Sequence, residues 1–192
     1  MRRPVRVVGL TGGIGAGKSE ALQAFARHGA AVLSSDQITH ELYERDDVRR
    51  SVAEHFGADV VADDGTIDRS RVAGVVFADP AELRWLEGLL LPLIYERFAA
   101  WRDRELAAGS GLLVHEAPTL FEAGVEDRYD AVVAITAPEA LRLQRRPGSE
   151  QRMATQLPEE EKALRSDFVF RNDGDLDALD RWVAGLVAQF GG

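Results

Sequence analysis

The sequence predicts an α/β fold in which a five-stranded parallel β-sheet is flanked by helices, with a helical insertion and a short lid. Two observations support this class. Short apolar runs alternate with amphipathic helical segments along the 192 residues, and this alternation is typical of parallel sheets covered by helices on both faces. The first apolar run also leads through a glycine-rich stretch into a helical segment, which is a common start of such a sheet.

Five segments are predicted to be strands, because each is a short apolar run bounded by turn or helix signals. The first is VRVVGL at residues 5–10. The other four are AAVLS (30–34), GLLVHEA (111–117), YDAVVAIT (129–136) and SDFVFRNDG (166–174). Because helical segments separate these runs, we expect the strands to lie parallel.

Helical periodicity fills the spaces between the strands. In residues 18–28, the apolar side chains Leu22, Phe25 and Ala26 fall on one face, and Gly29 follows as a C-cap. Further helices are expected at 37–44, at 138–165 with a break at 145–149, and at 175–190.

The long stretch between the second and third strands predicts an insertion. Its pattern is mostly helical over residues 46–104, interrupted at 62–70 by a turn centred on Asp-Gly. We expect a single domain over 1–192, with a core of 1–45 and 108–192, the helical insertion at about 46–107 and the lid at about 138–160.

The bulk composition excludes several classes of protein. The net charge is −9 and the pI about 5.0, so nucleic acid and membrane surfaces are not expected as partners. The absence of cysteine excludes disulfides and thiolate metal sites. The N-terminus lacks the apolar core of a signal peptide, and no apolar run reaches the roughly 18 residues that span a bilayer. We expect a cytoplasmic protein that is a monomer or a weak homo-oligomer.

The glycine-rich stretch is GGIGAGKS at residues 12–19, and it satisfies the pattern G-x-x-x-x-G-K-[ST] in full. Glycines let successive backbone N–H groups turn toward phosphate oxygens, and the following helix favours an anion at its N-terminus. Lys18, one of only two lysines in the chain, supplies a mobile cation, and Ser19 supplies a hydroxyl for Mg²⁺. An ordinary strand–helix turn would need neither. The stretch therefore predicts a P-loop NTPase fold that binds a nucleoside triphosphate.

Asp36 follows the second predicted strand, at the edge of the sheet where ligands bind in open α/β folds. A carboxylate at this place is suited to take the proton of an attacking hydroxyl. It is equally suited to cap the helix predicted at 37–44. Both interpretations of Asp36 stay open on the local sequence.

The charged segment between the fourth and fifth predicted strands contains a cluster of arginines: Arg142, Arg145, Arg146 and Arg152. Arginines on a lid that closes over phosphates would exclude water and stabilise the transferring charge. The alternative is a solvated helix face. The chain has no N-K-x-D signature of GTPase switches, and one phosphate loop in a short chain favours a small-molecule kinase.

Several stretches carry a resemblance to a known family. They are GLTGGIGAGKS (9–19), DGTIDRSRV (64–72), VFADPAELRWLEGLLLPLI (76–94), EAPTLFEAGVEDRYD (116–130), APEALRLQRR (137–146) and SDFVFRNDG (166–174). In this order they are similar to the bacterial dephospho-CoA kinases, over nearly the whole length of the chain.

The resemblance implies transfer of the γ-phosphate of ATP, with Mg²⁺, to the ribose 3′-hydroxyl of dephospho-CoA. It implies that Asp36 is the catalytic base, acting with Lys18 and Arg142. The residues implied to bind ATP are Gly12, Gly13, Ile14, Gly15, Ala16, Gly17, Lys18, Ser19, Glu20, Arg146 and Asn172, with Ser19 also binding Mg²⁺. Those implied to bind dephospho-CoA are Asp36, His40, Arg69, Phe77, Glu116, Pro118 and Leu120. The helical insertion is implied to bind the CoA moiety.

The chain also departs from the family pattern. Ser34 replaces a usual aspartate, His40 a usual arginine, Leu91 a usual histidine and Glu20 a usual threonine, and the lid is short. Either His40 replaces the contact of the arginine, or it lies on a solvated helix face. Glu116 is suited to a Mg²⁺-bound water, to the acceptor or to an arginine. Two other functions stay open: another small-molecule kinase with a nucleotide or sugar acceptor, and an ATP-binding regulator without kinase activity.

Overall fold

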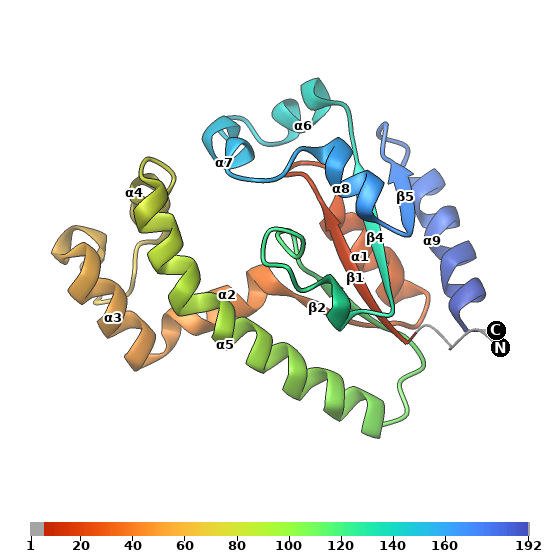
Figure 1. The fold of residues 1–192 in the computed structure, drawn as a ribbon, viewed down its shortest axis with the longest axis horizontal. Coiled ribbons are helices and arrows are strands. Elements are labelled where there is room, and N and C mark those ends of the chain that lie inside the picture. Colours follow the sequence, from red (N-terminus) through yellow and green to blue (C-terminus); the bar gives the residue numbers. More distant parts are fainter. Residues whose placement is uncertain (1–5, 192) are drawn as a thin grey trace. The chain divides into compact units, whose positions relative to one another are not determined.

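The computed structural model describes residues 6–191, and its strands form one parallel sheet. The strands are β1 (Val7–Gly12), β2 (Ala31–Ser34), β3 (Leu113–Glu116), β4 (Ala131–Thr136) and β5 (Phe168–Arg171). Their order across the sheet is β2-β3-β1-β4-β5, with β1 in the centre (Figure 1). The predicted five-stranded parallel sheet is confirmed.

The first strand lies two residues further along the chain than the predicted run 5–10, and residue 5 is outside the described residues. β1 extends as far as Gly12 because Thr11 and Gly12 still pair with Ala134 and Ile135 of β4. The glycine loop therefore leaves the sheet directly from a hydrogen-bonded strand, which fixes the position where the loop begins.

Five helices of the first unit agree with the predicted segments: α1 (Lys18–Arg27), α6 (Glu139–Arg145), α7 (Glu150–Ala154), α8 (Glu159–Arg165) and α9 (Leu176–Phe190). A short 3₁₀ helix that was not predicted, η2 (Glu126–Arg128), precedes β4. The predicted break at 145–149 is confirmed, since α6 ends at Arg145 and α7 begins at Glu150. A second break before α8 contains Pro158, which has no backbone N–H for a helix interior.

The hydrophobic core lies between one face of the sheet and two helices. Alternate strand residues point to this face, so Val8, Leu10 and Val133 are all fully buried in it. Phe25 of α1 and Val183 of α9 pack against them, and the two helices lie side by side (Figure 1). Burial of each such side chain stabilises the fold by about 1.5–3 kcal/mol, and it holds the base of the glycine loop rigid.

The chain forms two compact units. The first contains residues up to 34 and from 101 onward, and the second contains residues 35–100. The second unit is helical and consists of α2 (Ser35–Glu44), α3 (Asp46–Phe56), η1 (Ala58–Val60), α4 (Arg69–Val76) and most of α5 (Pro80–Ala107). The turn predicted at 62–70 is closed by an antiparallel bridge between Val61 and Ile67.

Within the second unit, a histidine joins α3 to α5. The ring of His55 stacks on that of Trp85 with centroids 3.6 Å apart and planes 6° apart. Its Nε2 atom lies 2.6 Å from a carboxylate oxygen of Glu82. His55 therefore has a structural role here. No helix in the stretch from residue 6 to residue 191 has both the length and the apolarity needed to cross a bilayer.

The helix expected at 37–44 begins two residues earlier, at Ser35. Asp36 is therefore in the first turn of α2 and does not precede the helix, so the interpretation of Asp36 as its N-cap is wrong. A carboxylate in the first turn is still favourable, because it faces the positive end of the helix dipole. Asp36 is exposed.

Candidate active site

The glycine loop connects β1 to α1 and is shaped by glycines that no other residue can replace. Gly15 and Gly17 have φ angles of +78° and +103°, in the left-handed region that disfavours a side chain. A Cβ atom on Gly15 would lie 2.6 Å from the backbone oxygen of Arg142, and one on Gly17 would lie 2.2 Å from Nδ2 of Asn172. Both space and backbone conformation therefore require glycine at these positions.

The side chain of Lys18 folds back onto the glycine loop. The Nζ atom of Lys18 donates to the backbone oxygen of Gly13 at 3.0 Å, and the N–H of Ala16 donates to the same oxygen at 3.2 Å. The Lys18 side chain is only 8% exposed, so its ammonium lies within the loop and not in solvent. Ser19 follows on the first turn of α1 and is exposed. This is the arrangement of a phosphate cradle at a helix N-terminus.

Two side chains from outside the loop hold its carbonyl groups. Arg145 on α6 donates from Nη1 to the oxygen of Gly15 at 3.1 Å. Asn172, just after β5, donates from Nδ2 to the oxygen of Ala16 at 2.8 Å and is 99% buried. Because the C=O and N–H of a planar peptide point in opposite directions, holding the Ala16 carbonyl directs the N–H of Gly17 to the opposite side of the loop.

Arg145 and Asn172 also contact each other, since Nη2 of Arg145 lies 3.4 Å from Oδ1 of Asn172. The same oxygen accepts the backbone N–H of Gly174 at 3.1 Å. Each hydrogen bond to the charged guanidinium contributes on the order of 1.5–3 kcal/mol. The brace of Arg145 and Asn172 therefore fixes the loop in one conformation before a ligand arrives.

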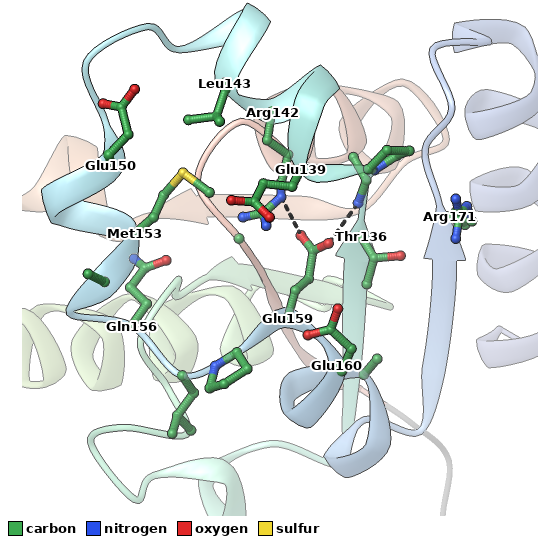
Figure 2. A pocket seen from close by; sticks show the side chains of 17 residues that line it. Thr136, Glu139, Arg142, Leu143, Glu150, Met153, Gln156, Glu159, Glu160 and Arg171 are labelled. Atoms are coloured by element: carbon green, nitrogen blue, oxygen red, sulfur yellow. Dashed lines mark hydrogen bonds and ion pairs between the residues drawn. The ribbon is translucent and has the colours of Figure 1, made fainter.

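Arg142 of α6 packs against the glycine loop, next to Gly13. Its Nη1 atom is 2.6 Å from the place where a Cβ on Gly13 would be, and Oε1 of Glu159 is 2.7 Å from that place. Nε of Arg142 lies 3.6 Å from Oε1 of Glu159, and the two side chains are 13% and 9% exposed. Figure 2 shows this pair joined by a dashed line. Both residues line a pocket of about 540 Å³, together with Met153 and Gln156.

Glu159 is the first residue of α8, and its environment changes its titration. Burial raises the pKa of the Glu159 carboxyl above 4.5, and this effect exceeds the opposing influence of the Ala137 N–H, Arg142 and the Gly13 N–H. Oε2 accepts the N–H of Ala137 at 3.0 Å. The carboxylate is thus held at the junction of α6, α8 and the glycine loop.

The end of β3 places a second carboxylate in the first unit. Glu116 is 4% exposed, and its Oε2 accepts the hydroxyl of Ser34 at 2.9 Å. Ser34, the last residue of β2, therefore contacts Glu116. Pro118 follows on the surface of the same edge, where its oxygen accepts the Thr11 hydroxyl at 3.1 Å. Leu120 is fully buried. Its predicted contact with the acceptor stays a prediction.

The second unit contains the other residues predicted to bind the acceptor. Nη1 of Arg69 donates to Nδ1 of His40 at 2.7 Å, so the structure brings these two together. A guanidinium has only donors, so Nδ1 of His40 is the acceptor in this contact. His40 is also largely exposed, as on a solvated helix face, and its contact with the acceptor stays a prediction. Phe77 ends α4.

The donor set fits Mg²⁺ bound largely by a nucleotide. Among residues 6–191, no group of three or more histidine, aspartate or glutamate side chains is placed to hold a metal. The exposed hydroxyl of Ser19 is a hard oxygen at the start of α1. Mg²⁺ commonly takes one or two protein oxygens together with phosphates and waters, and the residues present match this chemistry.

The sequence pointed to the loop but not to all of its supports. The resemblance implies that Arg146 binds ATP, and Arg146 is exposed at the C-cap of α6. Its neighbour Arg145 is the residue that contacts the loop. The signal that identifies Arg145 is its spacing of three from Arg142, which places both on one helix face. Glu159 had no sequence signal, because it begins a run of three glutamates typical of a solvated surface.

Comparisons with known proteins point to one family. The family model described as dephospho-CoA kinase matches residues 6–178. A dephospho-CoA kinase of Streptomyces avermitilis is 38% identical over 95% of this chain and 92% of its own length. One of Anaeromyxobacter dehalogenans is 38% identical with the same coverage, 95% and 92%.

Solved structures show the same fold. A protein from Thermus thermophilus, 30% identical, superposes with a TM-score of 0.78 over 99% of this chain and 100% of that chain. A dephospho-CoA kinase from Campylobacter jejuni, 20% identical, superposes with a TM-score of 0.65 over 96% and 97% of the two chains. The predicted P-loop kinase fold is confirmed.

Proposed function

This chain belongs to the dephospho-CoA kinase family, and we propose that it transfers the γ-phosphate of ATP to the ribose 3′-hydroxyl of dephospho-CoA, giving CoA and ADP. The observation that carries the proposal is the glycine loop, in which Lys18 is buried and the loop carbonyls are held by Arg145 and Asn172. Such a preformed cradle binds a triphosphate without reorganisation, which favours phosphoryl transfer.

On the donor side, loop N–H groups and the Lys18 ammonium would hold the β- and γ-phosphates. Ser19 would bind Mg²⁺, which neutralises charge on the phosphates when present. We assign the predicted ATP contacts to the loop residues from Gly12 to Glu20 and to Arg146 and Asn172. The buried amide of Asn172 already donates to the loop. We therefore propose that Asn172 acts on ATP by shaping the cradle as well as by lying near the adenine.

Arg142 would stabilise the charge on the transferring phosphoryl group. Its guanidinium lies beside Gly13, and its Nε atom is 3.6 Å from Oε1 of Glu159. A phosphate group carries more charge than this carboxylate and competes for the same donors. Arg142 would therefore shift from Glu159 toward the phosphates when ATP binds.

On the acceptor side, Asp36 would take the proton from the 3′-hydroxyl. Its place directly after β2 in the chain, and its exposure, support this role. We assign contacts with dephospho-CoA to His40, Arg69 and Phe77 in the second unit. We also assign contacts with dephospho-CoA to Glu116, Pro118 and Leu120 in the first unit. We further infer a cytoplasmic enzyme that is a monomer or weak homo-oligomer, in keeping with its acidic composition.

One assay tests the function. Purified protein is mixed with MgATP and, in separate reactions, dephospho-CoA, nucleoside monophosphates and simple sugars, and ADP release is measured while the product is identified by mass spectrometry. The proposal expects turnover with dephospho-CoA alone. Turnover with another acceptor identifies a different small-molecule kinase, and ATP binding with no turnover identifies a regulator.

A further inference from the structure

The second lysine of the chain is buried as completely as any core residue. Lys162 on α8 has no exposed surface. Transfer of an ammonium group out of water costs several kcal/mol unless strong partners compensate it. A leucine or methionine at this position would fill the same space at no such cost. The charge at Lys162 is therefore expected to have a directional role.

Both partners of the Lys162 ammonium lie in the segment that follows β3. Its Nζ atom donates to the backbone oxygen of Pro118 at 2.6 Å and pairs with Oε1 of Glu122 at 2.8 Å. The same Glu122 oxygen accepts the N–H of Leu157 at 2.9 Å. One ammonium thus holds both ends of the segment 118–122.

α8 has further contacts with this part of the chain. Arg165, one turn after Lys162, pairs with Glu126, and its guanidinium lies 4.4 Å from the centre of the Phe121 ring. At its other end, α8 begins with Glu159, which contacts Ala137 and faces Arg142 beside the glycine loop. A single seven-residue helix therefore contacts the phosphate cradle through its first residue and the segment 118–122 through its fourth.

We propose that Lys162 is a positioning residue for the acceptor. Its ammonium fixes the backbone of segment 118–122 in the conformation that receives dephospho-CoA. This inference rests on the proposed function, in which Pro118 and its neighbours contact the acceptor. Two directional partners at one buried cation define the path of the segment more narrowly than apolar packing does.

The test compares kinetic constants for the two substrates. Lys162→Met removes the cation at similar volume. Loosening of the segment should raise the KM for dephospho-CoA about tenfold or more, since small misplacements have large kinetic effects, while the KM for ATP changes less than about twofold. Leu164→Ala is the matched control, because Leu164 is on the same helix but 87% exposed.

A second variant separates positioning from stability. Lys162→Met leaves Glu122 without its cation, so the variant is expected to lose stability. The double variant Lys162→Met with Glu122→Gln removes both charges, while the amide oxygen of the glutamine can still accept the N–H of Leu157. Positioning by Lys162 predicts that the double variant regains its melting temperature but keeps the raised KM for dephospho-CoA. Hydrogen–deuterium exchange should be faster over residues 117–126 in both variants.

The outcomes are distinct. A folded single or double variant with wild-type KM for dephospho-CoA and unchanged exchange over 117–126 overturns the inference while the proposed function stands. If neither variant folds, the lysine is a structural residue and the inference also fails. A wild-type protein that does not phosphorylate dephospho-CoA overturns the proposed function, and the inference with it.

Discussion

Nε of Arg142 lies 3.6 Å from Oε1 of Glu159, and both atoms are buried without a hydrogen-bond partner. The two side chains compensate each other's charge, but these two atoms do not satisfy each other's hydrogen-bonding capacity. Such an arrangement is costly to keep, because buried polar groups without partners lose the free energy of their hydration. It is the arrangement expected of a guanidinium that has a better partner in another state of the protein.

Replacement of Glu159 by glutamine should stabilise the protein near neutral pH. The pKa of Glu159 is raised in the folded state, so its contribution to stability is full below about 4.5 and is lost as the pH rises through the folded-state pKa. Glutamine has no carboxyl to ionise, so the Glu159→Gln variant does not lose stability in this way as the pH rises. Its melting temperature should exceed that of the wild type near neutral pH, and the difference should shrink as the pH falls toward 4.5.

The control for this measurement is Glu54→Gln, which removes an exposed carboxylate. It should not change the melting temperature at either pH. A Glu159→Gln variant that is less stable than the wild type at neutral pH would show that the pair with Arg142 outweighs the burial of the carboxylate.

Loss of the brace at Arg145 should weaken ATP binding. Arg145→Leu removes the bonds to the Gly15 oxygen and to Asn172, and the loss of one charge-assisted hydrogen bond corresponds to roughly a tenfold change in the KM for ATP. The KM for dephospho-CoA should stay near the wild-type value. Gln144→Leu, an exposed neighbour on α6, is the control, and wild-type ATP kinetics in Arg145→Leu would contradict the prediction.

Replacement of the proposed base should affect turnover but not ATP affinity. Asp36→Asn keeps the size and polarity of the side chain but cannot take a proton, so kcat should fall by about 10²–10⁴-fold. The dissociation constant for ATP, measured by calorimetry, should be unchanged. Gln37→Ala serves as a control at the next exposed position on α2. Equal activity in Asp36→Asn would refute the assignment of the base.

His115 should make the protein sensitive to acid. Burial lowers the pKa of His115 from 6.5 to about 3, so the unfolded chain binds a proton that the folded protein refuses. Stability is then full above pH 6.5 and falls as the pH decreases toward 3, with a slope approaching about 1.4 kcal/mol per pH unit.

Chemical denaturation at several pH values measures this slope. His115→Leu should reduce it, whereas Tyr129→Phe removes only the hydroxyl that bonds Nδ1 of His115 at 2.8 Å and should keep it. An identical slope in the wild type and His115→Leu would mean that other groups cause the acid sensitivity.

The sheet and the glycine loop could be predicted because their signals are local. The run VRVVGL and the pattern GGIGAGKS each determine a strand or a turn within a few residues. The start of α2 was misplaced because Ser35 and Asp36 are residues that usually precede a helix. A local preference was overridden here, since the chain turns from β2 into α2 without an intervening loop.

The side chains that hold the glycine loop and the segment 118–122 could not be predicted to do so, because their contacts join distant parts of the chain. Asn172 holds Ala16 across 156 residues, and Lys162 holds Pro118 across 44. Helical periodicity places a charged residue on a face of a helix but does not say which face is buried. Glu159 and Lys162, both in a charged run, are buried only because α8 packs against β1 and β4.

The two lysines also determine how the folded protein reacts with acylating reagents. Lys18 is 8% exposed and Lys162 is fully buried, and the other basic side chains of the chain, apart from histidines, are arginines, whose guanidinium stays protonated and unreactive. An activated ester should therefore modify the lysines slowly in the native protein. Modification of Lys162 then reports the opening of α8, and protection of Lys18 by added nucleotide reports occupancy of the loop, so that one mass spectrum follows both events.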